Sequence, residues 1–210
     1  MRNVIWPMHI PGEHLDDGDV SLRLYCSDDA EQLFHAVRDE RAWEHLPTRM
    51  PSDFGELDAD ILARVADGHW LTFTVRHAGA VVGRTSVIWK RSAPEGVEIG
   101  GTQLDPAVWG TGVNMRVKRM LIREVFDQGA AWIGFRTDER NSRSAAAIRK
   151  LGATDLGVHQ DTLIRRDGSL RRSRFFRLDR PTTTAFQKAA RLTENQRERS
   201  LLPRKTSGMY

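Results

Sequence analysis

The stretch from Val97 to Asp127, VEIGGTQLDPAVWGTGVNMRVKRMLIREVFD, constrains the fold more than any other part of the chain. It predicts a strand over Val97–Leu104 that stops at Asp105-Pro106, because proline cannot donate a hydrogen bond to a neighbouring strand. Apolar residues then recur at three- and four-residue spacings, at Val113, Val117, Met120, Leu121 and Val125. That spacing is typical of one buried face of a helix. The stretch therefore predicts a strand that leads through a short loop into a helix.

The loop between the two elements reads Trp109-Gly110-Thr111-Gly112-Val113-Asn114. A loop of this kind leaves main-chain N–H groups unpaired at the positive end of a helix dipole, which favours a phosphate or diphosphate. Its two glycines permit positive φ angles and close approach of a ligand to the main chain. The loop has neither the Gly-Lys-Ser/Thr ending of a Walker loop nor the full dinucleotide fingerprint. A tight turn that binds nothing is the alternative interpretation of the same pattern.

The rest of the chain predicts a mixed, mostly antiparallel sheet with helices on both faces, an α/β (α+β) fold. Strands are predicted at 20–24, 69–76, 80–89, 133–137, 158–164 and 170–178. Helices are predicted from Ser27 or Asp28, over 53–67 and over 141–150, with Leu33, Phe34, Val37, Phe54, Leu57, Ile61, Leu62, Val65, Ser144, Ala147, Ile148 and Leu151 facing inward. Because strands and helices alternate after residue 97, one strand pair is expected to be parallel.

Composition places the chain among ordinary soluble globular proteins. It has 210 residues, of which 40% are hydrophobic and 29% are charged, and a net charge of +4. No apolar run is as long as a membrane span, and the first residues lack the apolar centre of a signal peptide, so a cytoplasmic protein is expected. The single cysteine, Cys26, excludes an intramolecular disulfide, and no histidine has the spacing of a metal ligand, so no metal is expected.

Changes in composition along the chain predict its domain organisation. Residues 1–19 contain two prolines and two glycines and are expected to form an irregular arm, which Trp6 and Ile10 anchor on the domain or on a second subunit. Residues 20–180 are expected to form one domain. Residues 181–210 are polar and basic, which predicts an extension that is helical in part, from about Thr184 to Leu202.

The order of several segments gives the sequence a family resemblance. The strand–loop–helix stretch resembles the acetyl-CoA-binding segment of the GNAT superfamily of N-acetyltransferases. It is most similar to the branch of the ribosomal-protein alanine acetyltransferases (RimJ/RimL type), in which a tryptophan-glycine-x-glycine loop is frequent. Further segments follow in the order of that branch: 20–24, 27–29, 133–137, 141–144, 150–153 and 166–169. The resemblance covers about residues 20–180.

The resemblance implies that the co-substrate is acetyl-CoA. The loop residues Trp109, Gly110, Thr111, Gly112, Val113 and Asn114 would hold its diphosphate through main-chain amides. Asn141 would contact the pantetheine or diphosphate arm, and Arg143 is the leading additional cofactor contact. The 3′-phosphate would meet a cation among Lys118, Arg119, Arg143 and Lys150. The chain departs from the family pattern in two places, with Trp109 where Gln or Arg is frequent and Asn114 where a small residue is usual.

The resemblance also implies catalytic roles. Glu98 lies on the strand before the loop, where the family often has a glutamate that deprotonates the amine, and partial burial would raise the pKa of its carboxyl. The usual tyrosine acid has Ile148 as its counterpart here. Ser144 stands three residues after Asn141, where the alanine-acetylating branch has a serine acid. The segment with Trp43, Glu44 and His45 would form a wall of the acceptor pocket.

Each of these roles has a structural alternative. Glu98 could be an ordinary strand carboxylate, since polar residues alternate with core residues in strands. Asn141 could cap the helix that it begins, and Ser144 could be a small residue that allows close packing. Trp43 could pack inward. The four cations named for the 3′-phosphate could be solvated charges on helix faces.

The predicted function is transfer of an acetyl group to a primary amine, either a protein N-terminus or a small molecule, by direct transfer in a ternary complex. The alternative is a GNAT-fold module that binds acyl-CoA for sensing or assembly without turnover. Nucleic-acid binding by the basic C-terminal residues is disfavoured, because Glu194 and Glu198 interrupt the run and stacking aromatics are absent there. A homodimer is expected, and a solution mass equal to one chain would contradict it.

Overall fold

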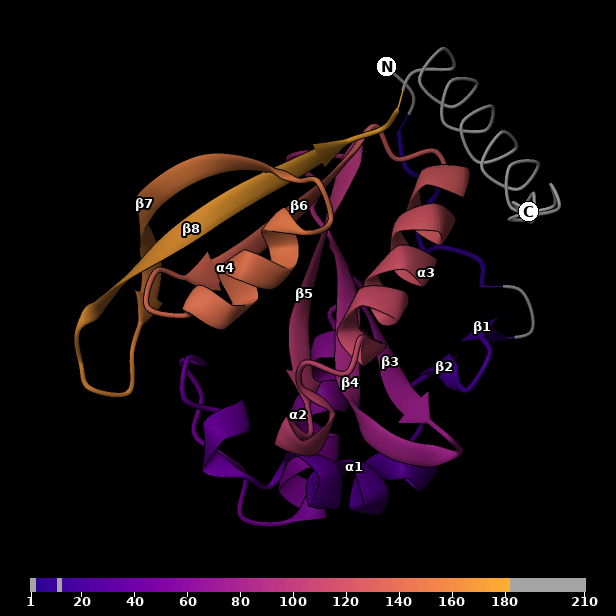
Figure 1. Cartoon of the computed structure of the whole chain (residues 1–210), viewed down its shortest axis with the longest axis vertical. Helices are drawn as coiled ribbons and strands as arrows, with labels where there is room; N and C mark the ends of the chain where they lie inside the picture. The colour runs from indigo at the N-terminus through magenta and orange to yellow at the C-terminus, as the bar shows by residue number, and fades with distance from the viewer. Residues whose placement is uncertain (1–2, 11–12, 182–210) are drawn as a thin grey trace, which may run out of the picture. The chain divides into compact units, whose positions relative to one another are not determined.

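The structure is a computed structural model of the chain that describes residues 3–10 and 13–181 (Figure 1). Contacts between residues divide the chain into a unit of Met1–Asp179 and a unit of Arg180–Tyr210. The helix expected from Thr184 and the basic residues near the C-terminus lie outside the described residues.

One eight-stranded sheet organises the first unit. Its strands are β1 (His14–Asp17), β2 (Val20–Leu24), β3 (Trp70–His77), β4 (Ala80–Trp89), β5 (Gly96–Leu104), β6 (Trp132–Asp138), β7 (Thr154–Ile164) and β8 (Leu170–Asp179). They lie in the order β1-β2-β3-β4-β5-β6-β8-β7, and only β5 and β6 pair in parallel. The predicted mixed, mostly antiparallel sheet with one parallel pair is confirmed.

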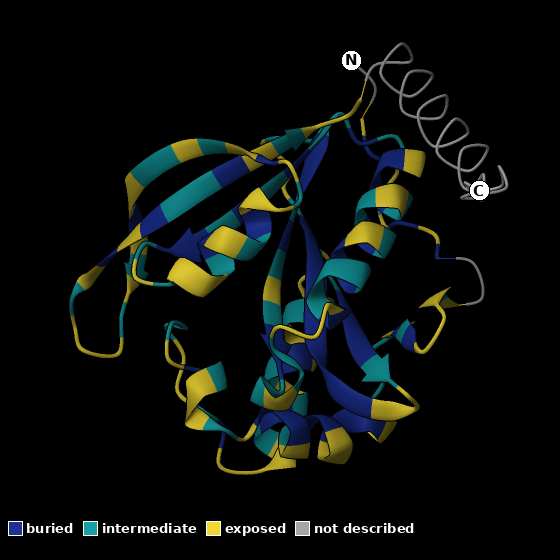
Figure 2. Cartoon of the chain, viewed as in Figure 1, coloured by how far each residue is buried: buried dark blue, intermediate teal, exposed yellow. Residues whose placement is uncertain are grey.

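Among the residues that the structure describes, α-helices and short 3₁₀ turns accompany the sheet. They are η2 (Ser27–Asp29), α1 (Ala30–Val37), η3 (Glu40–Ala42), α2 (Phe54–Ala66), η4 (Pro106–Val108), α3 (Val113–Asp127) and α4 (Ser142–Arg149). The main core lies between one face of the sheet and α3 and α4, and a second core joins α1 and α2 to the other face. Figure 2 shows that the middle strands are buried, while exposed residues gather on the outer faces of the helices. The predicted placement of helices on both faces is therefore confirmed.

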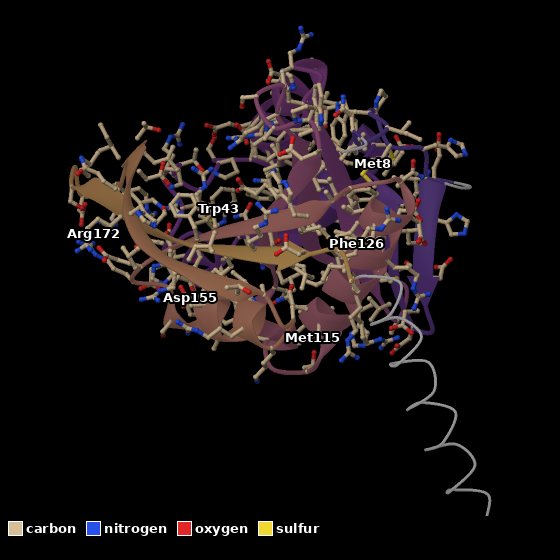
Figure 3. The ribbon with its side chains drawn as sticks, turned by 90° about the horizontal axis from the view of Figure 1, so that it is seen from above. Met8, Trp43, Met115, Phe126, Asp155 and Arg172 are labelled. Atoms are coloured by element: carbon tan, nitrogen blue, oxygen red, sulfur yellow. The ribbon has the colours of Figure 1, made fainter. Side chains whose placement is uncertain are left out.

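The described N-terminal residues form more than an irregular arm, which corrects the prediction for residues 1–19. β1 pairs antiparallel with β2 at the edge of the sheet. Met8 and Ile10 are buried in the main core, to which Phe126 of α3 also contributes (Figure 3), and the rings of Trp6 and Trp89 stack at 5.9 Å. The sequence HLDD of β1 lacks strand-forming residues, so pairing with β2 rather than local preference makes it a strand. These contacts anchor the segment on the domain.

The start of α2 agrees with the prediction from the sequence, whereas the start of α1 differs from it. Asp53 caps α2, and its carboxylate accepts a hydrogen bond from the amide of Glu56 at 2.8 Å. Neither Ser27 nor Asp28 caps α1, because a 3₁₀ turn precedes that helix and its N-cap position is Asp29. The Asp29 side chain accepts a hydrogen bond from Arg76 at 2.5 Å instead.

The inward faces of two helices are narrower than predicted. In α2 the buried residues are Leu57 and Ile61, whereas Phe54, Leu62 and Val65 are exposed. In α4 the buried residues are Ala145 and Ile148, and Ser144, Ala147 and Leu151 are only partly buried. Each helix contacts the sheet along a single stripe, so apolar residues at the edges of the predicted face remain near solvent.

Candidate active site

A cleft opens where the two parallel strands part. β5 and β6 pair only at Gly96 with Trp132, Val97 with Ile133, and Glu98 with Gly134. Beyond these pairs the strands diverge, as Figure 1 shows. A cleft of about 460 Å³ lies there, lined by the ends of both strands, the 109–114 loop, α3 and α4. The edges of β5 and β6 that face the cleft therefore carry main-chain groups that do not pair between the two strands.

The loop at the start of α3 presents main-chain donors to this cleft. Gly110 and Gly112 have φ angles of +79° and +93°, and a Cβ atom added to either would meet no atom within 4 Å. The amides of Gly110, Gly112, Val113 and Asn114 donate to no other group among residues 3–10 and 13–181. The loop therefore keeps four free donors at the positive end of a 15-residue helix.

The remaining donors in the loop already have partners. The amides of Trp109 and Thr111 close turns onto the carbonyl oxygens of Pro106 and Val108, at 3.2 and 3.4 Å. The indole of Trp109 donates to the carbonyl oxygen of Leu104 at 3.0 Å, which fixes the ring at the edge of the cleft. Of the six loop residues named from the sequence, these two contribute side chains and turn geometry rather than free amides.

Arg143 on α4 reaches back to the loop. Its guanidinium lies 3.3 Å from the centroid of the Trp109 ring, and the guanidinium of Arg41 lies 5.8 Å from the same ring. Partial burial lowers the pKa of Arg143, and the nearby Glu44 carboxylate opposes this effect. In the described part of the chain no carboxylate lies within ion-pair distance of Arg143. The cleft thus contains a cation that is available to an anion.

Asn141 and Ser144 lie at the start of α4, and both line the cleft. The Asn141 side chain accepts a hydrogen bond from the Ser144 amide at 2.9 Å, so it caps the helix. The Ser144 hydroxyl has no partner within the described ranges. The helix cap holds this hydroxyl in place at the cleft.

Glu98 lies on the opposite face of the sheet from α3 and α4. The neighbouring Val97 and Ile99 point into the main core, so Glu98 points away from it. Its side chain is 17% exposed and lines a smaller hollow of about 270 Å³. The carboxylate lies 3.7 Å from the Lys90 ammonium and 3.6 Å from the Arg136 guanidinium. Glu98 is thus partly buried and lies near two cations.

The three residues named for the acceptor wall lie in different surroundings. Trp43 is 2% exposed in the second core, where its indole donates to the carbonyl oxygen of Val37 at 2.6 Å. This is the inward packing that the sequence left open. His45 lines the cleft, and Glu44 is exposed with its carboxylate 3.8 Å from the His45 ring.

A buried group of charges supports the far side of the cleft. Asp138, at the end of β6, is 2% exposed and accepts hydrogen bonds from Arg165 at 2.7 and 3.0 Å, and the Arg171 guanidinium lies 3.9 Å away. Burial opposes ionisation of Asp138, but hydrogen bonds from Arg165 and the Arg140 amide outweigh it and hold the pKa of that carboxyl below its usual range. This group ties β6 to the β7–β8 hairpin.

Arg136 was not singled out from the sequence, although it lies at the centre of the site. It lines both the cleft and the hollow of Glu98, and its guanidinium also donates to Asp161 at 3.2 Å. The alternation of side chains between the two faces of β6 is the feature that could have identified Arg136 as a site residue. Arg136 follows Gly134 by two residues, and Gly134 pairs with Glu98, so all three share one face of the sheet.

No group of three or more His, Cys, Asp or Glu residues in the described part of the chain could hold a metal ion. No helix within the described ranges is long and apolar enough to cross a membrane.

The sheet, the parted strands and the helix start define an α/β protein with a cleft between two diverging parallel strands. A family model described as an acetyltransferase (GNAT) domain matches residues 19–154, well over half of the chain. The chain belongs to the GNAT acetyltransferase family. No protein with a curated description matched it.

Solved structures share the fold at low sequence identity. A probable GNAT-family acetyltransferase from Chromobacterium violaceum is 22% identical, with a TM-score of 0.76 over 85% of this chain and 90% of that one. An acetyltransferase from Salmonella typhimurium that modifies the N-terminal serine of ribosomal protein L7/L12 is 15% identical, with a TM-score of 0.71 over 80% and 100%. RimJ from Mycobacterium smegmatis, in complex with CoA-disulfide, is 19% identical, with a TM-score of 0.66 over 82% and 88%. The structural neighbours thus include ribosomal-protein acetyltransferases.

Proposed function

We propose that this protein transfers the acetyl group of acetyl-CoA to a primary amine, directly and within a ternary complex. The observation that carries the proposal is the parting of β5 and β6 immediately after Glu98 and Gly134. The opening has a cleft with free loop amides on one side and a hollow with a carboxylate on the other. A thioester and an amine that approach from opposite sides would meet where the strands part.

The cleft suits the chemical parts of coenzyme A. The free amides of the loop would bind the diphosphate, and the two open glycines would let it approach the main chain. The pantetheine arm contains amides, which would pair with the unpaired edges of β5 and β6 as an added strand does. Arg143 on α4 and Lys150 just after α4 line the cleft and would meet the remaining phosphate. Asn141 would act on the cofactor indirectly, because it caps α4 and so fixes the start of that helix at the cleft.

The chemistry needs one base and one proton donor. Glu98 would accept a proton from the ammonium form of the acceptor, directly or through a water molecule. The amine nitrogen then attacks the thioester carbonyl carbon, the C–S bond breaks, and the thiolate takes a proton to become free coenzyme A. The unpaired hydroxyl of Ser144 is our choice for the relay of that last proton, because it lines the cleft and has no other partner in the described part of the chain. It would give its proton to the thiolate and take up the second proton that the attacking nitrogen loses, so the serine returns to its neutral form.

We favour a protein α-amine as the acceptor, in keeping with the Salmonella typhimurium relative that modifies an N-terminal serine. His45 and the exposed Glu44 stand beside the cleft and would contact the acceptor. Trp43 would hold that wall from the core rather than touch the acceptor. We place the reaction in the cytoplasm, and we retain the homodimer as part of the proposal, with a solution mass of two chains as its support.

A module that binds acyl-CoA without turnover is the second candidate. Two observations favour it: Ile148 stands where many relatives have a tyrosine acid, and the Oδ1 atom of Asn114 is buried without a hydrogen-bond partner. Release of free thiol from acetyl-CoA in the presence of an amine panel distinguishes the two candidates. Binding without any thiol release above background would favour the module.

Binding of acetyl-CoA is tested by thermal unfolding of the wild type and of Gly112→Glu. At a hundredfold excess over its Kd the cofactor should stabilise the wild type by about 2.7 kcal/mol. Glu at position 112 should remove this gain, because its carboxylate would enter the open space over the loop and repel the diphosphate.

Gly68→Glu is the matched control for backbone strain. Gly68 has a φ of +73° with open space around it and does not line the cleft. This variant should lose stability in the free form but keep the full gain from acetyl-CoA. Absence of any gain in the wild type would refute the proposed function.

A further inference from the structure

Lys118 on α3 has an environment that the proposed function does not explain. The sequence names it among four candidate cations for the 3′-phosphate, with a solvated charge on a helix face as the alternative, and in the structure it is only 7% exposed. Its ammonium donates to the hydroxyls of Thr85 at 3.0 Å and Thr102 at 2.5 Å, and these hydroxyls lie 2.8 Å from each other. Both threonines belong to adjacent strands beneath α3, and Thr102 and Lys118 line the cleft.

The ammonium has no compensating negative charge. Within residues 3–10 and 13–181 no carboxylate lies within ion-pair distance of it, whereas the buried Arg171 has Asp138. Arg84, the neighbour of Thr85, donates to Gln103 and lies 5.9 Å from the Trp43 ring, in the other core. The remaining charged or titratable groups that line the cleft are Arg41, His45, Arg136, Asp138, Arg143, Lys150 and Arg171.

Burial without a counter-charge disfavours the protonated form. Burial alone lowers the pKa of Lys118 to about 7. The ammonium is thus a buried charge whose two partners are neutral hydroxyls, a costly arrangement unless an anion joins it. An anion at the loop would be close, because Lys118 lies four to six residues along the chain from the free amides of Gly112, Val113 and Asn114, or roughly 6–9 Å at the helical rise.

We propose that Lys118 is a binding residue for the diphosphate of coenzyme A, and that binding of the cofactor drives uptake of a proton at Lys118 Nζ. The inference rests on the proposed function, because it takes coenzyme A as the ligand of the cleft. In the free protein at pH 8 most of the Lys118 side chains are neutral amines that lie between the two threonine hydroxyls. In the complex the diphosphate at the start of α3 supplies the missing negative charge, and the ammonium becomes the stable form.

The proton uptake has a defined size and pH dependence. A group with a pKa of about 7 is roughly 10% protonated at pH 8, and two added negative charges nearby should bring it close to full protonation. About 0.8 proton should therefore be taken up per coenzyme A at pH 8. Near pH 6 the free protein already holds this proton, so the uptake should fall to about 0.1.

Titration calorimetry of the full chain with coenzyme A at pH 8, in phosphate and in Tris buffer, measures this uptake. The difference in binding enthalpy between buffers of different ionisation enthalpy gives the number of protons. The phosphates of the cofactor are already ionised at pH 8, since the second pKa of a phosphate ester is near 6. Dephospho-coenzyme A lacks the 3′-phosphate but keeps the diphosphate, so it shows which of the two groups supplies the negative charge. The uptake should persist with it, because the diphosphate remains.

Three variants assign the proton. Lys118→Met should bind coenzyme A more weakly, by about tenfold or more, and without uptake. Lys118→Arg carries a permanent charge and should bind without uptake, which keeps the test valid if the methionine variant fails to fold. His45→Gln removes the histidine that lines the cleft and should leave the uptake in place.

The possible outcomes distinguish the proposed function from the proposed role of Lys118. If the wild type does not bind coenzyme A, the proposed function itself fails. If the wild type binds it with no uptake, if Lys118→Met retains the uptake, or if His45→Gln abolishes it, the role of Lys118 is refuted while the proposed function stands. Loss of uptake with dephospho-coenzyme A would overturn the assignment to the diphosphate.

Discussion

Glu98→Gln is expected to lower kcat by about 10²- to 10⁴-fold and to leave the affinity for acetyl-CoA nearly unchanged. Glutamine has the shape of glutamate but cannot accept a proton from the amine. Glu98 lines the smaller hollow and not the cleft of the loop, so the cofactor keeps its contacts. Thiol release with the best amine of the panel measures kcat, and thermal unfolding with acetyl-CoA measures binding.

Asp161→Asn is the matched control for this experiment. Asp161 is the second carboxylate beside Arg136, at 3.2 Å, but it does not line the hollow of Glu98. If Glu98 acts as the base, Asp161→Asn should retain most of the activity. Equal losses in both variants would show that the two carboxylates act only through Arg136, and Glu98 would not be the base.

Asp138→Ala is expected to lower the free energy of unfolding by about 3 to 5 kcal/mol. The substitution removes the Asp138 carboxylate from the largely buried guanidinium groups of Arg165 and Arg171, and Arg165 keeps Glu139 at 3.4 Å as a more distant partner. Asparagine at the same position keeps an acceptor for the Arg140 amide, so Asp138→Asn isolates the loss of charge. Urea unfolding at pH 7 measures the free energy of unfolding of the wild type, Asp138→Ala and Asp138→Asn.

The pH dependence of this effect has a definite sign. The pKa of Asp138 is lowered in the folded protein, so its contribution is complete above about pH 4, where an unfolded aspartate is ionised. The contribution should be lost as the pH falls through the lowered value, and the wild type and Asp138→Ala should then approach each other. A constant difference between them down to pH 2 would contradict the ion-pair explanation.

Asp60→Ala provides the comparison with an exposed ion pair. Asp60 pairs with Arg64 on the surface of α2 at 3.1 Å, four residues apart. Such pairs contribute about 0.3–0.5 kcal/mol. A loss for Asp138→Ala as small as that for Asp60→Ala would show that the buried charges do not hold β6 to the β7–β8 hairpin.

Local chemistry made most of the fold predictable. Pro106 ends β5, and Ala78-Gly79 and Asp167-Gly168 turn the chain between paired strands, because these residues restrict or permit particular φ angles. The stop before η4 and the start of α3 at Val113 follow from the same kind of information. The predicted inward face of α2 is less accurate, since Phe54 and Leu62 are apolar at helical spacing but lie outside the stripe that contacts the sheet.

The strand β1 is not predicted by the sequence, because local sequence preferences do not indicate it. Its residues carry no local preference for a strand, and only the edge of β2 gives them hydrogen-bond partners. Trp43 and Lys118 show the same limit for side chains. A tryptophan beside polar residues and a lysine on a helix could each face solvent, and contacts with Val37, Thr85 and Thr102 decide that they do not.

The sequence by itself determined the strand–loop–helix unit, with its glycines, its free amides and the dipole of α3, because all of these depend on residues close together in the chain. Only the tertiary structure decided what surrounds Glu98 and Lys118. Arg136 reaches Glu98 from β6, and Lys90 reaches it from the position just after β4. Lys118 lines the cleft, and among the described residues no carboxylate lies within ion-pair distance of it. The electrostatic environment of a group depends on charges and burial supplied by distant residues, and these meet only when the sheet has formed.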